Sequence, residues 1–329
     1  MTSLSLPEPL AAMRGAIGRH RRAIGWAVNL AVLGFIGWQV WQLGIGAVMN
    51  ALPANPLFYG IYLLHFAATP FAERRIFALM WPGERLVPWR VLLRKRTMNA
   101  VLISYSGDLW FYLWARARTA LTDRRILSSV KDSTILSGIA AAAGTGLMTV
   151  WAVATGGGET IRLAIGDHVR AAVIAGVVAL FALPMMFRLR GAIFGLATRL
   201  IWAVLGWHVA RLVATQILQA WQWAVAMPQV PFELWLLLLT VQLVVLQIPL
   251  VPNADLIFLA VGVRLTGELG VDRAQLTALL LATSVFKQIV NLGTLAITSM
   301  ITPAQPDAEP QVDRGDALPE REEADQGRA

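Results

Sequence analysis

The sequence contains no cysteine, which excludes disulfide bonds, thiolate catalysis and metal sites built on cysteine. It also lacks the P-loop, the G-x-G-x-x-G dinucleotide motif, the H-E-x-x-H zinc motif and the G-x-S-x-G nucleophile motif. Its four histidines lie in separate segments, without the spacing that ligands of one metal ion need. The polar stretches are too short for a soluble catalytic domain. We therefore expect no metal or other cofactor, and nothing specific indicates an enzyme.

The chain does contain long stretches without charged residues. Of its 329 residues 57% are hydrophobic, against about 45–50% in soluble domains, and the mean hydropathy is +0.59. The period-two alternation of a membrane β-barrel is missing. The sequence predicts an all-α, polytopic integral membrane helix bundle, with about seven spans and one or two broken or re-entrant helices. Apolar runs near the ~20 residues that cross a bilayer place these spans at 23–43, 57–81, 133–155, 169–187, 191–227, 232–251 and 273–300.

Charge divides the chain into three parts: a basic lead at 1–22, a transmembrane helical domain at 23–301 and an acidic tail at 302–329. The tail has no apolar period, so we expect it to be disordered, and it could recruit a protein partner. The net charge is +8, but the basic residues cluster at the ends of apolar runs, as membrane topology requires. No nucleic-acid-binding signature accompanies them.

Topology and composition also predict where the protein resides. Only three of the 28 basic residues are lysine, a usage typical of GC-rich bacterial genomes. Because the lead before the first span is basic, its N-terminus should be cytoplasmic. We expect a multi-pass protein of a bacterial inner membrane, in contact with anionic lipids.

The stretch Thr97–Thr119 is apolar but has arginine and lysine on both sides. Basic residues mark the cytoplasmic side of a membrane, so both of its ends should lie on that side. Ser104 to Asp108 in its middle contains residues that interrupt helices. We interpret it as a re-entrant hairpin, whose non-helical backbone at membrane depth must be satisfied by protein or by a watery cavity.

Two expected helices carry polar side chains along one face. Steps of three and four residues place such side chains in line, and a polar line within an apolar span should face protein or water. One line is His208, Arg211, Thr215, Gln219 and Gln222, and the other is Thr283, Lys287, Asn291, Thr294 and Thr298.

A second break is expected at 252–263, where Pro252-Asn253-Ala254-Asp255 precedes an apolar run too short to span. Together with Asp108, Asp255 would balance the two cations Arg211 and Lys287 in a polar cavity that accepts an anionic headgroup. The alternative is structural: Lys287 pairs with Asp255, and Arg211 pairs with Asp108 or a carbonyl. Asp255 could also cap a helix.

The order of these features resembles the membrane domain of the lysylphosphatidylglycerol synthase and flippase family. The resemblance rests on Ser106-Gly107-Asp108 followed by Trp114-Ala115-Arg116, on the basic stretch from Asp123-Arg124-Arg125 to Lys131-Asp132, and on Ile248-Pro249 to Asp255 with Gly262-Val263-Arg264 beyond. The family's double glycine is Ser-Gly here. The resemblance implies a protein that binds or moves a lipid or lipid-linked molecule, without the aminoacyl-transferase domain.

Three functions follow from this sequence. The first is a transporter-like protein for an anionic lipid or lipid-linked substrate. The second is a non-transporting membrane scaffold or assembly factor that uses its acidic tail. The third is an intramembrane lipid-modifying enzyme. For the first, the predicted substrate-binding residues are Ser106, Asp108, Arg116, His208, Arg211, Asp255, Lys287 and Asn291.

Overall fold

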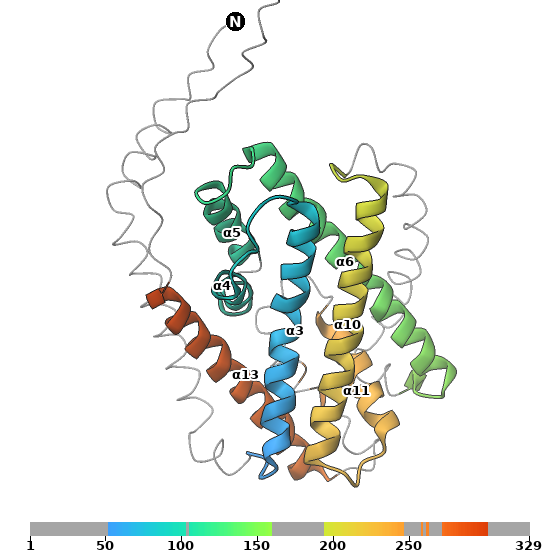
Figure 1. Ribbon diagram of the computed structural model, residues 1–329. Helices are drawn as coiled ribbons and strands as arrows, with labels where there is room; N and C mark the ends of the chain where they lie inside the picture. Colours follow the sequence, from blue (N-terminus) through green and yellow to red (C-terminus); the bar gives the residue numbers. More distant parts are fainter. Residues whose placement is uncertain are drawn as a thin grey trace, which may run out of the picture.

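The computed structural model describes residues 52–102, 105–159, 194–246, 258, 261–262 and 272–301. Regular structure within these ranges is helical throughout, without a strand, which confirms the all-α prediction for this part of the chain. The expected spans at 23–43 and 169–187, Asp255 and the acidic tail lie outside the described residues. Figure 1 shows the helices α3 Pro56–Met80, α4 Trp89–Val101, α5 Ser106–Arg116, α6 Asp123–Ala154, α10 Thr198–Ala226, α11 Phe232–Leu246 and α13 Arg273–Ile301.

Three of these helices are long and apolar enough to cross a membrane: α6, α10 and α13 over Ala274–Ile301. Helix α3 has the length, but Glu73, Arg74 and Arg75 interrupt its apolar surface. Helix α11 is apolar but has only 15 residues. The described part of the chain is therefore compatible with a membrane protein, and it does not support the expected number of seven spans.

Local chemistry explains where several helices begin. Asn55 caps α3, because its side chain accepts a hydrogen bond from Leu57 N at 3.0 Å and a proline follows at the first helical position. Thr122 caps α6 in the same way through Arg125 N at 3.4 Å. Pro88, with fixed backbone geometry and no N–H to leave unpaired, directly precedes α4.

Two apolar clusters hold the helices together. One joins α10, α11 and α13 around Trp223, Trp235 and Leu276, and the other joins α3 to α6 and α10 around Phe77, Phe111 and several aliphatic side chains. Figure 1 shows α3 and α10 running side by side, with α13 crossing behind them toward α4. Leucine and valine on the outer faces of α3, α6 and α10 are exposed, as a lipid-facing surface requires.

The chain does break where the sequence predicts an interruption, but with a different geometry. Helix α4 ends at Val101 and α5 begins at Ser106, and the two pack against each other. Tyr105, just before α5, has a left-handed φ of 69°. Gly107, which belongs to the stretch expected to interrupt the helix, lies inside the first turn of α5. The hairpin is also longer than expected, since α4 starts at Trp89 instead of Thr97.

Gly107 instead permits the close approach of α4 and α5. A Cβ built on it would overlap the carbonyl oxygen of Lys95 and lie 2.8 Å from Asn99 Oδ1. Replacing Gly107 by alanine is therefore expected to push the two helices apart, at a cost of about 1–3 kcal/mol. Gly138→Ala is the matched control, since a Cβ there meets no atom within 4 Å and alanine favours helix. Thermal unfolding in detergent should show a lower midpoint for Gly107→Ala only, and equal midpoints would contradict the close approach.

Candidate functional site

A buried lysine joins three helices at the hairpin. Lys95 Nζ on α4 lies 2.5 Å from Glu73 Oε1 on α3 and 3.1 Å from Asp108 Oδ1 on α5. Only 5% of Lys95 is exposed, so the two carboxylates take the place of water around its ammonium group. The rings of Phe77 and Phe111, each 5.8 Å away, also face this ammonium group.

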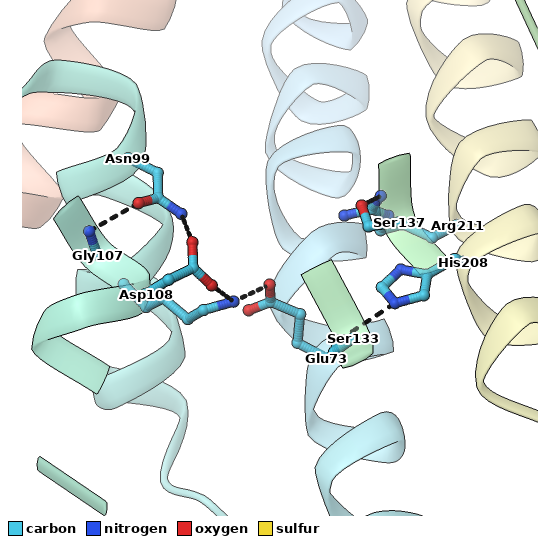
Figure 2. A network of polar contacts seen from close by, with 9 residues as sticks. Glu73, Asn99, Gly107, Asp108, Ser133, Ser137, His208 and Arg211 are labelled. Carbon is cyan, nitrogen blue, oxygen red and sulfur yellow. Dashed lines mark hydrogen bonds and ion pairs between the residues drawn. The ribbon is translucent and has the colours of Figure 1, made fainter. Parts of the chain in front are cut away.

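Asn99 connects this charge cluster to the helix break. Its Nδ2 donates to Asp108 Oδ2 at 2.7 Å, and its Oδ1 accepts from Gly107 N at 2.7 Å. Figure 2 shows Asn99, Asp108 and Glu73 pointing toward one another between the hairpin and α3. Both oxygens of Asp108 are thus used, and one otherwise unpaired N–H at the start of α5 is satisfied. The cluster fixes how the hairpin docks on α3.

The polar residues of α10 that are expected in the site have partners on α6. Arg211 pairs with neither carboxylate of the Lys95 cluster; its Nη2 donates to Ser137 Oγ at 3.0 Å. His208 Nε2 lies 3.2 Å from Ser133 Oγ. Both contacts join α10 to α6, and Figure 2 shows them on the other side of Glu73 from Asp108. The alternative in which Arg211 pairs with Asp108 is therefore wrong.

Two further predicted binding residues at the hairpin have structural contacts. Ser106 Oγ donates to Met98 O at 3.0 Å, which satisfies a carbonyl near the end of α4. Arg116 Nε pairs with Asp123 Oδ1 at 3.0 Å, and both side chains are half exposed. The structure has a cavity among α3, α4, α10, α11 and α13. Neither Ser106 nor Arg116 lines it, and neither do Asp108, His208 and Arg211.

This polar cavity, of about 120 Å³, lies among α3, α4, α10, α11 and α13. It is large enough to hold water. Two cations, Arg96 from α4 and Lys287 from α13, contribute to its wall. The other lining residues are Tyr62, His65, Gln216, Gln219, Trp223, Gln242, Leu246, Phe258, Leu280, Thr283 and Ser284.

Several buried polar atoms of this wall have no hydrogen-bond partner among the described residues. They are Arg96 Nε, His65 Nδ1, Gln216 Oε1 and Trp223 Nε1. Leaving such a group unpaired costs about 1–3 kcal/mol, so a polar ligand or water entering the cavity would be stabilised. Trp223 is fully buried, which makes its indole N–H a fixed donor.

The charge of the cavity wall is positive. None of the lining residues is an aspartate or glutamate within the ranges that the structure describes. Arg96 is held in place, because its Nη1 donates to Phe66 O at 3.1 Å and its guanidinium lies 4.2 Å from the centre of the Phe66 ring. Such a wall attracts an anion and repels a cation.

The sequence identifies part of this cavity. Lys287 and Thr283 from the polar line of α13 contribute to its wall, as does Gln219 from the line of α10. Asn291, one turn beyond Lys287, is buried but lies outside the wall. In the charge pattern, Lys95 and Arg96 are only basic residues that flank the expected hairpin at Thr97–Thr119. A helix that begins directly after Pro88 includes both of them.

In its described part, the protein is therefore all-helical and compatible with a membrane location, and it contains a broken helix pair and a cavity lined by two cations. No protein-family model, no curated protein and no solved structure matches the chain.

Proposed function

We propose that this protein is an integral membrane protein that binds, and moves, an anionic lipid or lipid-linked molecule through the cavity lined by Arg96 and Lys287. The observation that carries the proposal is this pair of cations, from α4 and α13, facing one cavity whose wall has no described carboxylate. Ionisable side chains within apolar helices are rare and mark candidate binding sites. Both cations can donate charge-assisted hydrogen bonds to the oxygen atoms of an anionic headgroup.

The neutral groups of the wall fit the same ligand. The Trp223 indole N–H and the Gln216 and Gln219 side chains would hydrogen-bond oxygen atoms of a headgroup. Leu246 also lines the cavity and is half exposed on the apolar helix α11. This favours a ligand with an apolar part, which would extend past Leu246 into lipid while its charged group enters the cavity.

The hairpin of α4 and α5 would place one of the two cations at the cavity. Basic residues precede α4 and follow α5, so both ends of the hairpin belong on the cytoplasmic side and its turn at Tyr105 enters the membrane. Lys95 docks the hairpin on α3, and the next residue, Arg96, reaches the cavity. The hairpin would thus position one of the two ligand-binding cations. The proposed topology keeps a cytoplasmic N-terminus in a bacterial inner membrane.

Transport of lipids agrees with the resemblance of the sequence to the membrane domain of lysylphosphatidylglycerol synthases and flippases. The proposed binding residues nevertheless differ from those expected on that basis. Arg96 and Lys287 replace Arg116 and Asp108, because only the former pair lines the cavity.

Native mass spectrometry of the protein extracted with its membrane lipids tests the proposal. We expect one anionic lipid or lipid-linked molecule to stay bound at collision energies that remove zwitterionic lipids. Retention of all lipid classes in proportion to their abundance would contradict specific binding. A protein free of lipid but bound to a polypeptide would support a scaffold function instead.

A further inference from the structure

Within the residues that the structure describes, one end of the bundle carries most of the exposed positive charge. The C-terminal ends of α3 and α5 meet the N-terminal ends of α4, α6 and α10 there: Arg125 Nη2 donates to Met80 O at 3.5 Å, and Ala120 N donates to Glu84 Oε1 at 3.1 Å. We call this end the basic end. Its exposed cations are Arg75, Arg85, Arg90, Arg116, Arg118, Arg124, Arg125, Lys131 and Arg199.

Few negative charges balance the basic end. Of the acidic residues described there, Asp123 is paired with Arg116, buried Asp132 is paired with Lys131, and Glu84 accepts the Ala120 N–H. The opposite end of the bundle carries exposed Glu233 and Asp272 instead. The described part of the molecule is therefore strongly polarised, and its basic end should attract an acidic partner.

The chain itself contains a segment of the complementary charge. Residues 302–329 include eight aspartates and glutamates against three arginines, a net charge of −5. The segment follows Ile301, the last residue of α13, and α13 packs against α4 of the hairpin. Figure 1 shows α13 running from the end opposite the basic end up toward α4.

The length of this segment is sufficient to reach the basic end. Treated as the flexible chain that its composition predicts, its 28 residues have a root-mean-square extension of about 30 Å. Attachment to the same molecule gives it an effective concentration in the millimolar range. A partner in solution would have to exceed that concentration or bind more tightly.

From this charge complementarity and the position of Ile301, we infer that the acidic segment 302–329 docks on the basic end of its own chain. The contact is electrostatic and involves many weak pairs. It covers the exposed arginines at the ends of α5 and α6 and keeps them from anionic headgroups or other acidic molecules. The inference does not depend on what the cavity binds.

Distance measurement between spin labels tests this inference, and the absence of cysteine in the chain makes site-specific labelling direct. One label is placed in the segment by Ala317→Cys and the other at the basic end by Ala120→Cys. Ala54→Cys at the opposite end of α3 replaces the second site in the control; both Ala120 and Ala54 are exposed. The measurements use the full chain in nanodiscs with and without anionic lipid.

We expect the 317–120 distance to be short and well defined at low salt, and to lengthen and broaden near 1 M salt, where the Debye length falls to about 3 Å. The 317–54 distance should be long and insensitive to salt. A variant with Glu320→Gln, Glu322→Gln, Glu323→Gln and Asp325→Asn keeps the length of the segment and should lose the short distance. A 317–120 distance that changes neither with salt nor with these substitutions would overturn the inference. So would loss of the short distance whenever anionic lipid is present, because headgroups would then occupy the basic end.

Discussion

Replacing Lys95 by methionine is expected to lower the free energy of unfolding by about 3–5 kcal/mol, the usual cost of removing one partner from a buried ion pair. The ammonium group neutralises Glu73 and Asp108 in the interior. Its removal leaves two carboxylates buried without a cation. The midpoint of thermal unfolding in detergent should fall by many degrees, or the variant should fail to accumulate in the membrane.

The matched variants separate charge from packing. Combining Lys95→Met with Glu73→Gln and Asp108→Asn removes all three charges, and we expect it to recover most of the lost stability, because neutral groups are cheaper to bury. Arg199→Met removes a cation from the exposed start of α10 and should change the midpoint little. If the triple variant were as unstable as Lys95→Met, the charge balance around Lys95 would not be what holds the hairpin.

Neutralising either cation of the cavity is expected to have the largest effect on ligand binding. A hydrogen bond to a charged group contributes about 1.5–3 kcal/mol, so Arg96→Gln and Lys287→Gln should each reduce the affinity for the anionic lipid by about 10- to 100-fold. Titration of the purified protein with that lipid, followed by native mass spectrometry, measures the change.

The control for these variants is Arg199→Gln, which removes an exposed cation that does not line the cavity. Its affinity should stay close to that of the unchanged protein. An equal loss of affinity in all three variants would mean that the lipid responds to the overall positive charge and that the cavity does not bind it. Unfolding midpoints of the three variants show whether any loss arises from misfolding.

The features that the sequence predicts well are local ones. Apolar composition and the absence of alternation predict helices, and the residues around Ser104 to Asp108 predict a break, because both depend on neighbours in the chain. The polar line on α13 correctly indicates a side facing protein, with Thr283 and Asn291 buried. Its residue Lys287 does line the cavity.

The features that the sequence does not reveal depend on which helices meet. Asp108 pairs with Lys95, thirteen positions earlier, because α4 begins at Trp89 and turns Lys95 toward α3. The sequence leaves Arg211 open as a partner of Asp108, but α10 packs so that Arg211 meets Ser137 on α6. From the sequence, Gly107 is a residue whose flexible backbone helps to interrupt a helix. In the structure, its missing side chain allows α4 and α5 to approach each other closely. Pairing of this kind is decided by tertiary packing.

Site-specific photo-crosslinking at the rim of the cavity tests the central claim most directly. A benzophenone amino acid at Leu246, which lines the cavity and is half exposed, should capture the anionic lipid in excess of its share of the membrane, and Lys287→Gln should abolish this excess. The same probe at Trp221, exposed on α10 outside the cavity, should capture lipids in proportion to their abundance. If both positions yield adducts that follow the bulk lipid composition, the cavity does not select an anionic ligand.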